Sequence, residues 1–142
     1  MTQRQLETLN TAECMALLGQ EHIGRLVYLD ERGPVAEPVN YLVAGTDIVF
    51  RVEGGTKVRA MAQPLLAFEV DQVDEETRSG WSVIVRGTGS EVALPQVPDL
   101  IRRAEGQLPG PWAIGVHNVW LQITPTSVTG RRLGAVRLPV IF

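Results

Sequence analysis

Residues 23–52 read IGRLVYLDERGPVAEPVNYLVAGTDIVFRV, and the pattern of this stretch decides the fold. Three apolar runs, at 23–29, 35–43 and 48–52, are separated by two polar clusters that are typical of turns. The last run carries Ile, Phe and Val at every second position, as a half-buried strand requires. The stretch therefore predicts a meander of three antiparallel strands.

The rest of the chain adds further strands and a few short helices. Strands are expected at 65–73, from 81 towards 93 with a kink at 87–89, and at 119–124 and 127–133. Helices are expected after an N-cap at Asn10 with Glu13 completing a capping box and Gly19 as the stop, at 57–63, and at 98–107. We expect one mainly β (α+β) domain over residues 1–142, barrel-like, with six or seven antiparallel strands and two or three short helices.

The composition excludes several classes of protein. A chain of 142 residues with 44% apolar and 20% charged residues is typical of one globular domain. The formal net charge of −3 gives no general attraction to nucleic acid or to an anionic membrane. The single cysteine, Cys14, lies in an apolar stretch and is interpreted as a small buried side chain. No run of 18 apolar residues occurs, so a cytoplasmic protein is expected.

The stretch from Phe50 to Lys57 is the candidate for a phosphate site. A strand ends, glycines follow, and a short helix is expected to begin, which leaves backbone N–H groups free to bind an anion. Thr56 adds a hydroxyl, and Lys57 and Arg51 add positive charge. The pattern is not a Walker A loop, because the first glycine is missing and the order is Gly-Thr-Lys. An ordinary Gly-Gly turn beside a solvated lysine remains the alternative.

Several aromatic and amide residues fit a flat heterocyclic ligand. Asn40 and Tyr41 lie in the middle of a predicted strand, where charged residues or threonine are more usual on a solvent face. Trp81 opens another strand, and alternation sets it and Ser82 on opposite faces. A planar ligand needs stacking surface and a few polar contacts at its edge, which these residues and Trp120 can supply. Packing in the core or at a subunit interface is the alternative for each tryptophan.

Six short motifs in this order resemble the pyridoxamine 5′-phosphate oxidase-like family, most closely its short actinobacterial-type members related to the nitroimidazole-reductase-like branch. They are Gly24-Arg25-Leu26, Pro38-Val39-Asn40-Tyr41, Gly55-Thr56-Lys57, Phe68-Glu69-Val70-Asp71, Gly80-Trp81-Ser82-Val83 and Val128-Thr129-Gly130-Arg131-Arg132. The resemblance implies an antiparallel split β-barrel that forms a homodimer and binds FMN, or in some members a deazaflavin, at the subunit interface. It implies an FMN-dependent oxidoreductase acting on a small-molecule substrate that the sequence does not identify.

The same resemblance assigns cofactor contacts. The strand of Asn40 and Tyr41 is expected beside the flavin ring, with Phe50 and Arg51 along the ribityl chain. The phosphate is expected at Gly55, Thr56 and Lys57. Ser82 is expected at the ring edge with Trp81 close by, and Trp120 is expected to close the cleft from the partner subunit.

The chain also departs from the family pattern. Thr56 stands where a second basic residue is expected, and no substrate-phosphate motif occurs near the C-terminus, so vitamin B6 oxidation is not favoured. A carrier or sensor that binds flavin or haem without turnover is therefore a second hypothesis. Neither histidine has a partner at ligand spacing, and no metal site is expected. Arg131 and Arg132 are left open between a cofactor phosphate and a partner carboxylate.

Overall fold

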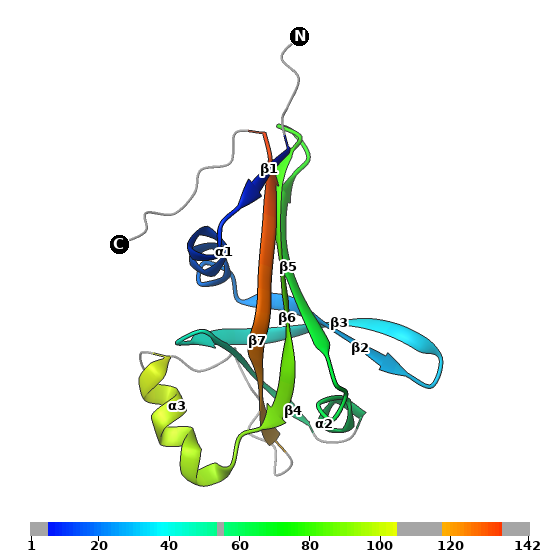
Figure 1. Cartoon of the computed structure of the whole chain (residues 1–142), viewed down its shortest axis with the longest axis vertical. Coiled ribbons are helices and arrows are strands. Elements are labelled where there is room, and N and C mark those ends of the chain that lie inside the picture. The colour runs from blue at the N-terminus through cyan, green and yellow to red at the C-terminus, as the bar shows by residue number, and fades with distance from the viewer. Residues whose placement is uncertain (1–5, 54–55, 105–117, 135–142) are drawn as a thin grey trace.

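The computed structural model describes residues 6–53, 56–104 and 118–134, which form seven strands and three α-helices (Figure 1). The elements are β1 (Leu6–Leu9), α1 (Thr11–Leu18), β2 (Ile23–Asp30), β3 (Gly33–Ala44), β4 (Asp47–Glu53), α2 (Thr56–Ala60), β5 (Leu66–Asp74), β6 (Ser79–Glu91), a short 3-10 turn (Leu94–Gln96), α3 (Val97–Arg103) and β7 (Asn118–Leu133).

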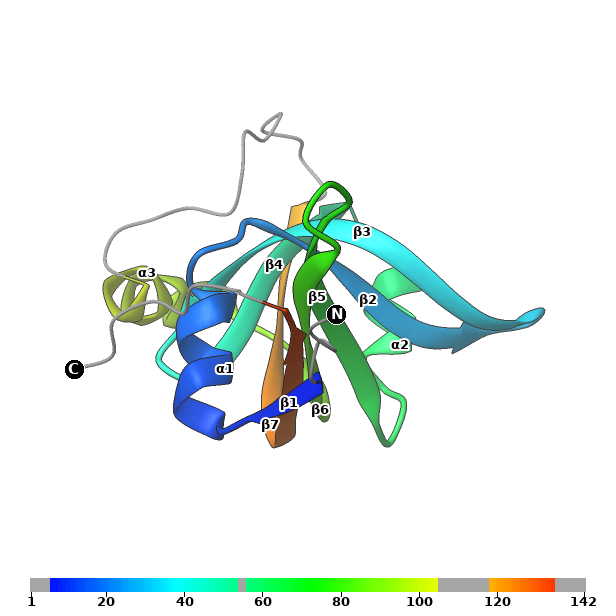
Figure 2. The same cartoon turned by 90° about the horizontal axis from the view of Figure 1, so that it is seen from above.

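The strands close into a barrel because β7 pairs on both of its edges. The order along the sheet is β1-β7-β4-β3-β2-β5-β6, and β6 pairs back onto β7. All of these pairings are antiparallel, and β2, β3 and β4 form the predicted meander. Seen from above, α1 and α3 lie on one side of the barrel and α2 on the other, next to the projecting β2–β3 hairpin (Figure 2). The prediction of an antiparallel split barrel with short helices is confirmed.

The last strand corrects one expectation. Residues 119–124 and 127–133 were expected as two strands, but they form one strand, β7. A bulge accommodates the polar residues between them, since Arg86 lies opposite Ser127 while Gly87 lies opposite Pro125. Thr126 is the extra residue, and its hydroxyl donates to the Arg86 carbonyl at 3.2 Å. The register shift lies next to Gly87, where a kink of β6 was expected, but the extra residue is on β7.

The ends of the helices agree with their sequence signals, with small shifts. The capping box at α1 is present, because the Glu13 amide donates to Asn10 Oδ1 at 2.8 Å and the Asn10 amide donates to Glu13 Oε1 at 3.0 Å. Gly19 follows the helix with φ of −70°, so its left-handed freedom is not used. Helix α2 starts one residue earlier than expected and ends three residues sooner, at Ala60. The short strand β1 was not predicted, because three of its four residues are exposed and show no apolar alternation.

Two apolar clusters lie on the two sides of the barrel wall. The larger one fills the interior around three aromatic rings, with Tyr41 edge-on to Phe68 at 5.0 Å and Phe50 stacked on Phe68 at 6.1 Å between centroids. The Tyr41 hydroxyl donates to the Leu18 carbonyl at 2.6 Å and ties the end of α1 to the barrel. The smaller cluster lies outside the wall under α3 and includes Leu100 and Trp120.

Gly24 leaves room for the buried ring of Phe68. A β-carbon at Gly24 on β2 would lie 2.4 Å from a ring carbon of Phe68. That separation is far below van der Waals contact, and the ring is fully buried. Gly24 is therefore required by close packing.

We expect Gly24→Ala to lower the free energy of unfolding by about 1–3 kcal/mol, because overpacking a dense core forces side chains out of their rotamers. Urea denaturation measures the change. Gly19→Ala is the matched control, since its nearest contact would be at 3.6 Å and its backbone is right-handed. Equal stability of Gly24→Ala and the wild type would contradict this account of the core.

Candidate functional site

The barrel wall separates the residues predicted to bind a cofactor into two groups. Tyr41 and Phe50 point into the interior, where they are 1% and 0% exposed. Their strand neighbours Asn40 and Arg51 alternate to the outer face and are half-buried. Inside this chain, Tyr41 and Phe50 contribute aromatic packing, and only their backbone lies next to the outer face.

The outer face of β3, β4 and β7 brings three predicted residues together. Tyr41 pairs with Phe50, so continuing the register places Asn40 beside Arg51. Arg51 in turn lies opposite Trp120 on β7, and its guanidinium carbon is 5.4 Å from the centroid of the Trp120 ring. A cation held over an aromatic face at this distance is electrostatically favourable. Asn40, Arg51 and Trp120, here called the outer row, combine an amide, a cation and an indole that is 9% exposed and belongs to the cluster under α3.

The predicted phosphate loop follows directly from this row. Strand β4 ends at Glu53 and α2 begins at Thr56, which is the predicted order of strand, loop and helix. Gly55 lies outside the described residues, and the side chains of Thr56 and Lys57 are likewise not described. Their role as phosphate ligands stays a prediction.

Trp81 and Ser82 lie elsewhere on the barrel. Trp81 points inward, is 7% exposed and belongs to the interior cluster. Ser82 points outward from β6, opposite Asp71 on one side and Arg131 on the other. Strands β2 and β5 lie between β6 and β3, and on β7 Ser82 pairs with Arg131, eleven residues after Trp120, so Ser82 is not a direct neighbour of the outer row. The predicted opposite orientation of the two residues is confirmed.

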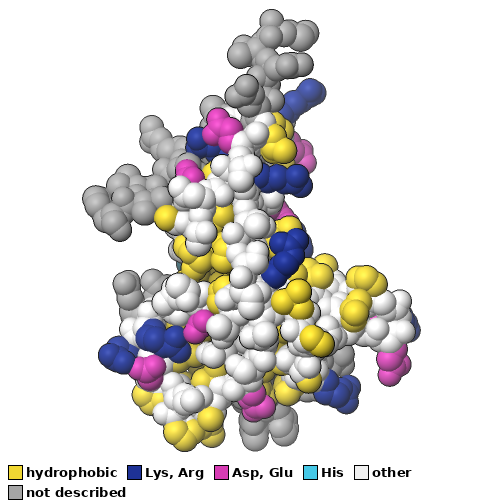
Figure 3. All heavy atoms as spheres, viewed as in Figure 1, with side chains coloured by type: hydrophobic (Ala, Val, Ile, Leu, Met, Phe, Trp, Pro, Cys, Tyr) yellow, Lys and Arg dark blue, Asp and Glu magenta, His cyan; other side chains and the backbone are white. Residues whose placement is uncertain are grey.

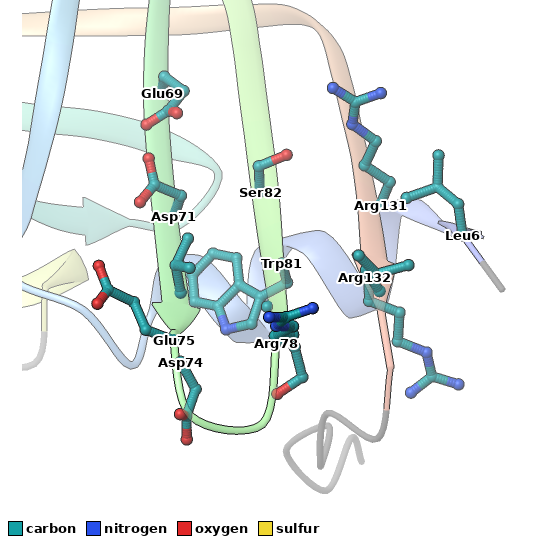
Figure 4. A pocket seen from close by; sticks show the side chains of 14 residues that line it. Leu6, Glu69, Asp71, Asp74, Glu75, Arg78, Trp81, Ser82, Arg131 and Arg132 are labelled. Atoms are coloured by element: carbon teal, nitrogen blue, oxygen red, sulfur yellow. The ribbon is translucent and has the colours of Figure 1, made fainter. Parts of the chain in front are cut away.

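A hollow that was not expected from the sequence lies at the β5–β6 turn. It has a volume of about 740 Å³ and is lined by residues of β1, β5, β6 and β7, including Asp71, Trp81, Ser82 and Arg131 (Figure 4). Beside it, the Arg25 guanidinium lies 3.3 Å from Glu69 and 3.1 Å from Asp71. Alternating acids in β5 were visible in the sequence, but the register that places Arg25 beside them was not.

The two carboxylates are close enough to compete for protons. Partial burial raises the pKa of Glu69 to about 7, and a hydrogen bond with Asp71 and the Asp71 charge act in the same direction. Arg25 opposes this shift but does not cancel it. Elsewhere, charges of both signs are interspersed over the surface seen in Figure 3. Because the net charge is small, electrostatic attraction of a charged ligand must come from local groups of side chains.

We expect the stability of the wild type to fall as pH rises from about 4.5 towards about 7, relative to Glu69→Gln. The folded chain holds the Glu69 proton up to its raised pKa, whereas the unfolded chain releases it near the ordinary value of 4.5. Urea midpoints at a series of pH values measure the difference.

The exposed carboxylate Glu31 supplies the control variant Glu31→Gln, which should keep the wild-type pH profile. Identical profiles for Glu69→Gln and the wild type would show that Glu69 titrates normally.

The other groups to consider are the cysteine and possible metal ligands. Cys14 is fully buried, and this burial raises the pKa of its thiol, as expected for a packing residue. Within residues 6–53, 56–104 and 118–134, no cluster of three or more His, Cys, Asp or Glu side chains could hold a metal ion. A search of the same ranges finds no helix with the length and apolar character needed to span a membrane.

Comparison with known proteins identifies the family. A family model described as pyridoxamine 5′-phosphate oxidase matches residues 10–132. The chain belongs to this family. It is 33% identical over 138 residues to an uncharacterized protein of Mycobacterium tuberculosis, covering 93% of this chain and 88% of the relative. The resemblance inferred from the six sequence motifs is thereby confirmed.

Solved structures extend the comparison. A Mycobacterium smegmatis structure described as an FAD binding protein is 35% identical, with a TM-score of 0.73 and coverage of 89% of this chain and 98% of that one. A Bacteroides thetaiotaomicron structure described as a candidate 5-nitroimidazole antibiotic resistance protein has a TM-score of 0.73 over 93% of this chain and 90% of that one. Its identity is 9%, so it shows a shared fold alone.

Proposed function

We propose that the chain binds a flavin nucleotide, FMN in the first instance, against the outer row and uses it as an oxidoreductase. The observation that carries the proposal is the Arg51 guanidinium held over Trp120, one loop before the predicted phosphate ligands, with Asn40 one residue beyond the last β3–β4 pair. The relative from Mycobacterium smegmatis, described as an FAD binding protein, supports a flavin and makes FAD an alternative to FMN. Deazaflavin is the third alternative.

The residues of the outer row fit such a ligand. Arg51 would supply positive charge to the ribityl phosphate, Asn40 would hydrogen-bond the polar edge of the ring, and Trp120 would hold the guanidinium in place. Gly55, Thr56 and Lys57 would bind the phosphate. The flavin, when bound, supplies the hydride chemistry, and the protein supplies binding, orientation and electrostatics.

We further propose that the working unit is a homodimer. Two strands lie between Ser82 and β3, and on β7 Ser82 pairs with Arg131, eleven residues after Trp120. In a cleft between two copies, as the family resemblance implies, the second copy would supply Ser82. A cleft shared by two copies would then combine the outer row of one chain with β6 of the other.

A flavin carrier or sensor without turnover is the second candidate. It is favoured by the outer row itself, since none of its three side chains is a carboxylate, imidazole or thiol that could act as an acid or base. Steady-state turnover with a nicotinamide reductant and an electron acceptor separates the two. Reduction of the acceptor by the loaded protein supports the oxidoreductase, and its absence supports the carrier.

The visible absorption spectrum of the purified protein is the first test. A flavin spectrum, followed by chromatography of the chromophore released by heat, distinguishes FMN from FAD. A colourless protein is then titrated with FMN, FAD, deazaflavin and haem. Failure to bind any of the three flavins would contradict the proposed function.

We expect Arg51→Met to raise the Kd for FMN by about 10- to 100-fold, the loss of one or two hydrogen bonds from a charged donor. Quenching of flavin fluorescence measures the affinity, and thermal unfolding checks the fold. The Kd for riboflavin, which lacks the phosphate, should change much less.

Arg102→Met on α3 is the matched control, because Arg102 is 79% exposed and lies outside the outer row. It should bind FMN as the wild type does. An unchanged FMN affinity in Arg51→Met would move the phosphate site away from the outer row.

A further inference from the structure

Strand β4 carries both the attachment point of helix α3 and the guanidinium of the outer row. Asp47, Val49 and Arg51 alternate with residues of the interior cluster and so share the outer face of the strand. Val49 is fully buried and belongs to the smaller cluster under α3. Arg51 is the next outward residue and lies opposite Trp120. Helix α3 therefore covers this face of β4 as far as Val49, and the half-buried Arg51 lies at the border of the covered area.

An ion pair attaches α3 to the start of β4. The Arg103 guanidinium lies 3.1 Å from the Asp47 carboxylate, and the Asp47 side chain is only 16% exposed. Arg103 also lies 3.2 Å from Asp99, one helical turn earlier, which orients its side chain. The neighbouring Arg102 pairs with Asp99 as well but is 79% exposed. Of the ion pairs between described residues, the one at Arg103 is thus the link between α3 and the barrel wall.

The indole of Trp120 connects α3 with Arg51. It lies in the buried cluster under α3 together with Leu100 of the helix, which is 1% exposed. The Val92 amide donates to the Trp120 carbonyl at 2.8 Å, so the backbone beside the indole is fixed as well. The Arg51 guanidinium carbon lies 5.4 Å from the centroid of this ring. The position of the guanidinium therefore depends on the ring, and that of the ring depends on α3.

We infer that α3 positions the Arg51 guanidinium for the flavin phosphate, with Trp120 and Arg103 as positioning residues that act through Arg51. The inference rests on the flavin site proposed above and names the element that orders it. An arginine side chain has several rotatable bonds, and binding a phosphate costs it conformational freedom. A guanidinium that is already held over an aromatic ring loses less freedom when the ligand binds, and this preorganisation increases the affinity.

The alternative is that Trp120 and Arg103 contribute only to the stability of α3. Their substitution would then weaken the binding of FMN and of riboflavin equally, because the two ligands share the flavin ring and the ribityl chain. Riboflavin lacks the phosphate, so its affinity does not depend on where the Arg51 guanidinium is held. Comparison of the two ligands therefore separates a positioned guanidinium from general damage to the site.

The test is a double-mutant cycle with Arg51→Met, in which quenching of flavin fluorescence measures the Kd. We expect Trp120→Leu to raise the Kd for FMN by about 5- to 20-fold, the range of one cation–π contact, and Trp120→Phe to recover most of the affinity because it keeps an aromatic face. Arg103→Met should raise the Kd for FMN by about threefold, since it loosens α3 without removing the ring. The Kd for riboflavin should change by less than about twofold in all three, and neither Trp120→Leu nor Arg103→Met should weaken FMN binding further in the Arg51→Met background.

Arg102→Met is the matched control for Arg103→Met. Both arginines lie on α3 and pair with Asp99, but the ion pair with Asp47 is formed by Arg103. The control should bind FMN as the wild type does. Thermal unfolding checks that each variant is folded. Arg103 lies at the surface with its side chain 37% exposed, so its variant carries the test even where Trp120→Leu does not fold.

The outcomes separate this inference from the proposed function. Equal losses of affinity for FMN and riboflavin, or losses that add to that of Arg51→Met, would overturn the inference and leave the proposed function standing. Wild-type affinity for FMN in both Trp120→Leu and Arg103→Met would have the same meaning. A wild type that binds no flavin would contradict the proposed function and the inference together.

Discussion

The antiparallel barrel wall has only two faces, and successive side chains of each strand must alternate between them. Every other property of the chain depends on this constraint. The inner face carries Tyr41, Phe50 and Phe68, which are fully buried and pack against one another. Any chemistry must therefore be carried by the alternate positions, which face α3 or solvent. Asn40 and Arg51 are in such positions because their neighbours are committed to the core.

This division explains which parts of the molecule the sequence could predict. Alternation of apolar residues placed β2 to β6 to within a few residues, and the capping box placed the start of α1. The same signal split β7 in two, because Pro125 and Thr126 lie at a bulge that keeps the strand continuous. A bulge is defined by the pairing with the neighbouring strand. The sequence pattern of β7 alone therefore does not predict it.

The candidate site shows the same limit. Residue types suggested a flavin-sized ligand, and the structure places Asn40, Arg51 and Trp120 in one row. It places Trp81 in the core and Ser82 beyond two further strands, since cross-strand register, not order along the chain, sets these distances. The ion pairs of Arg25 with Glu69 and Asp71 could not be predicted for the same reason, because 44 residues separate Arg25 from Glu69.

The double pairing of β7 also has a consequence for how the chain is made. Strand β1 pairs with β7 at Leu6 and Leu133, and β7 covers the open edges of β4 and β6. Until the last strand has been synthesised, the meander exists as a sheet whose edges can pair with other chains. Such long-range pairings are slow to form. Pairing of β7 along both edges converts a sheet with open edges into a closed wall, so closure of the barrel requires the strand that comes latest among the described residues.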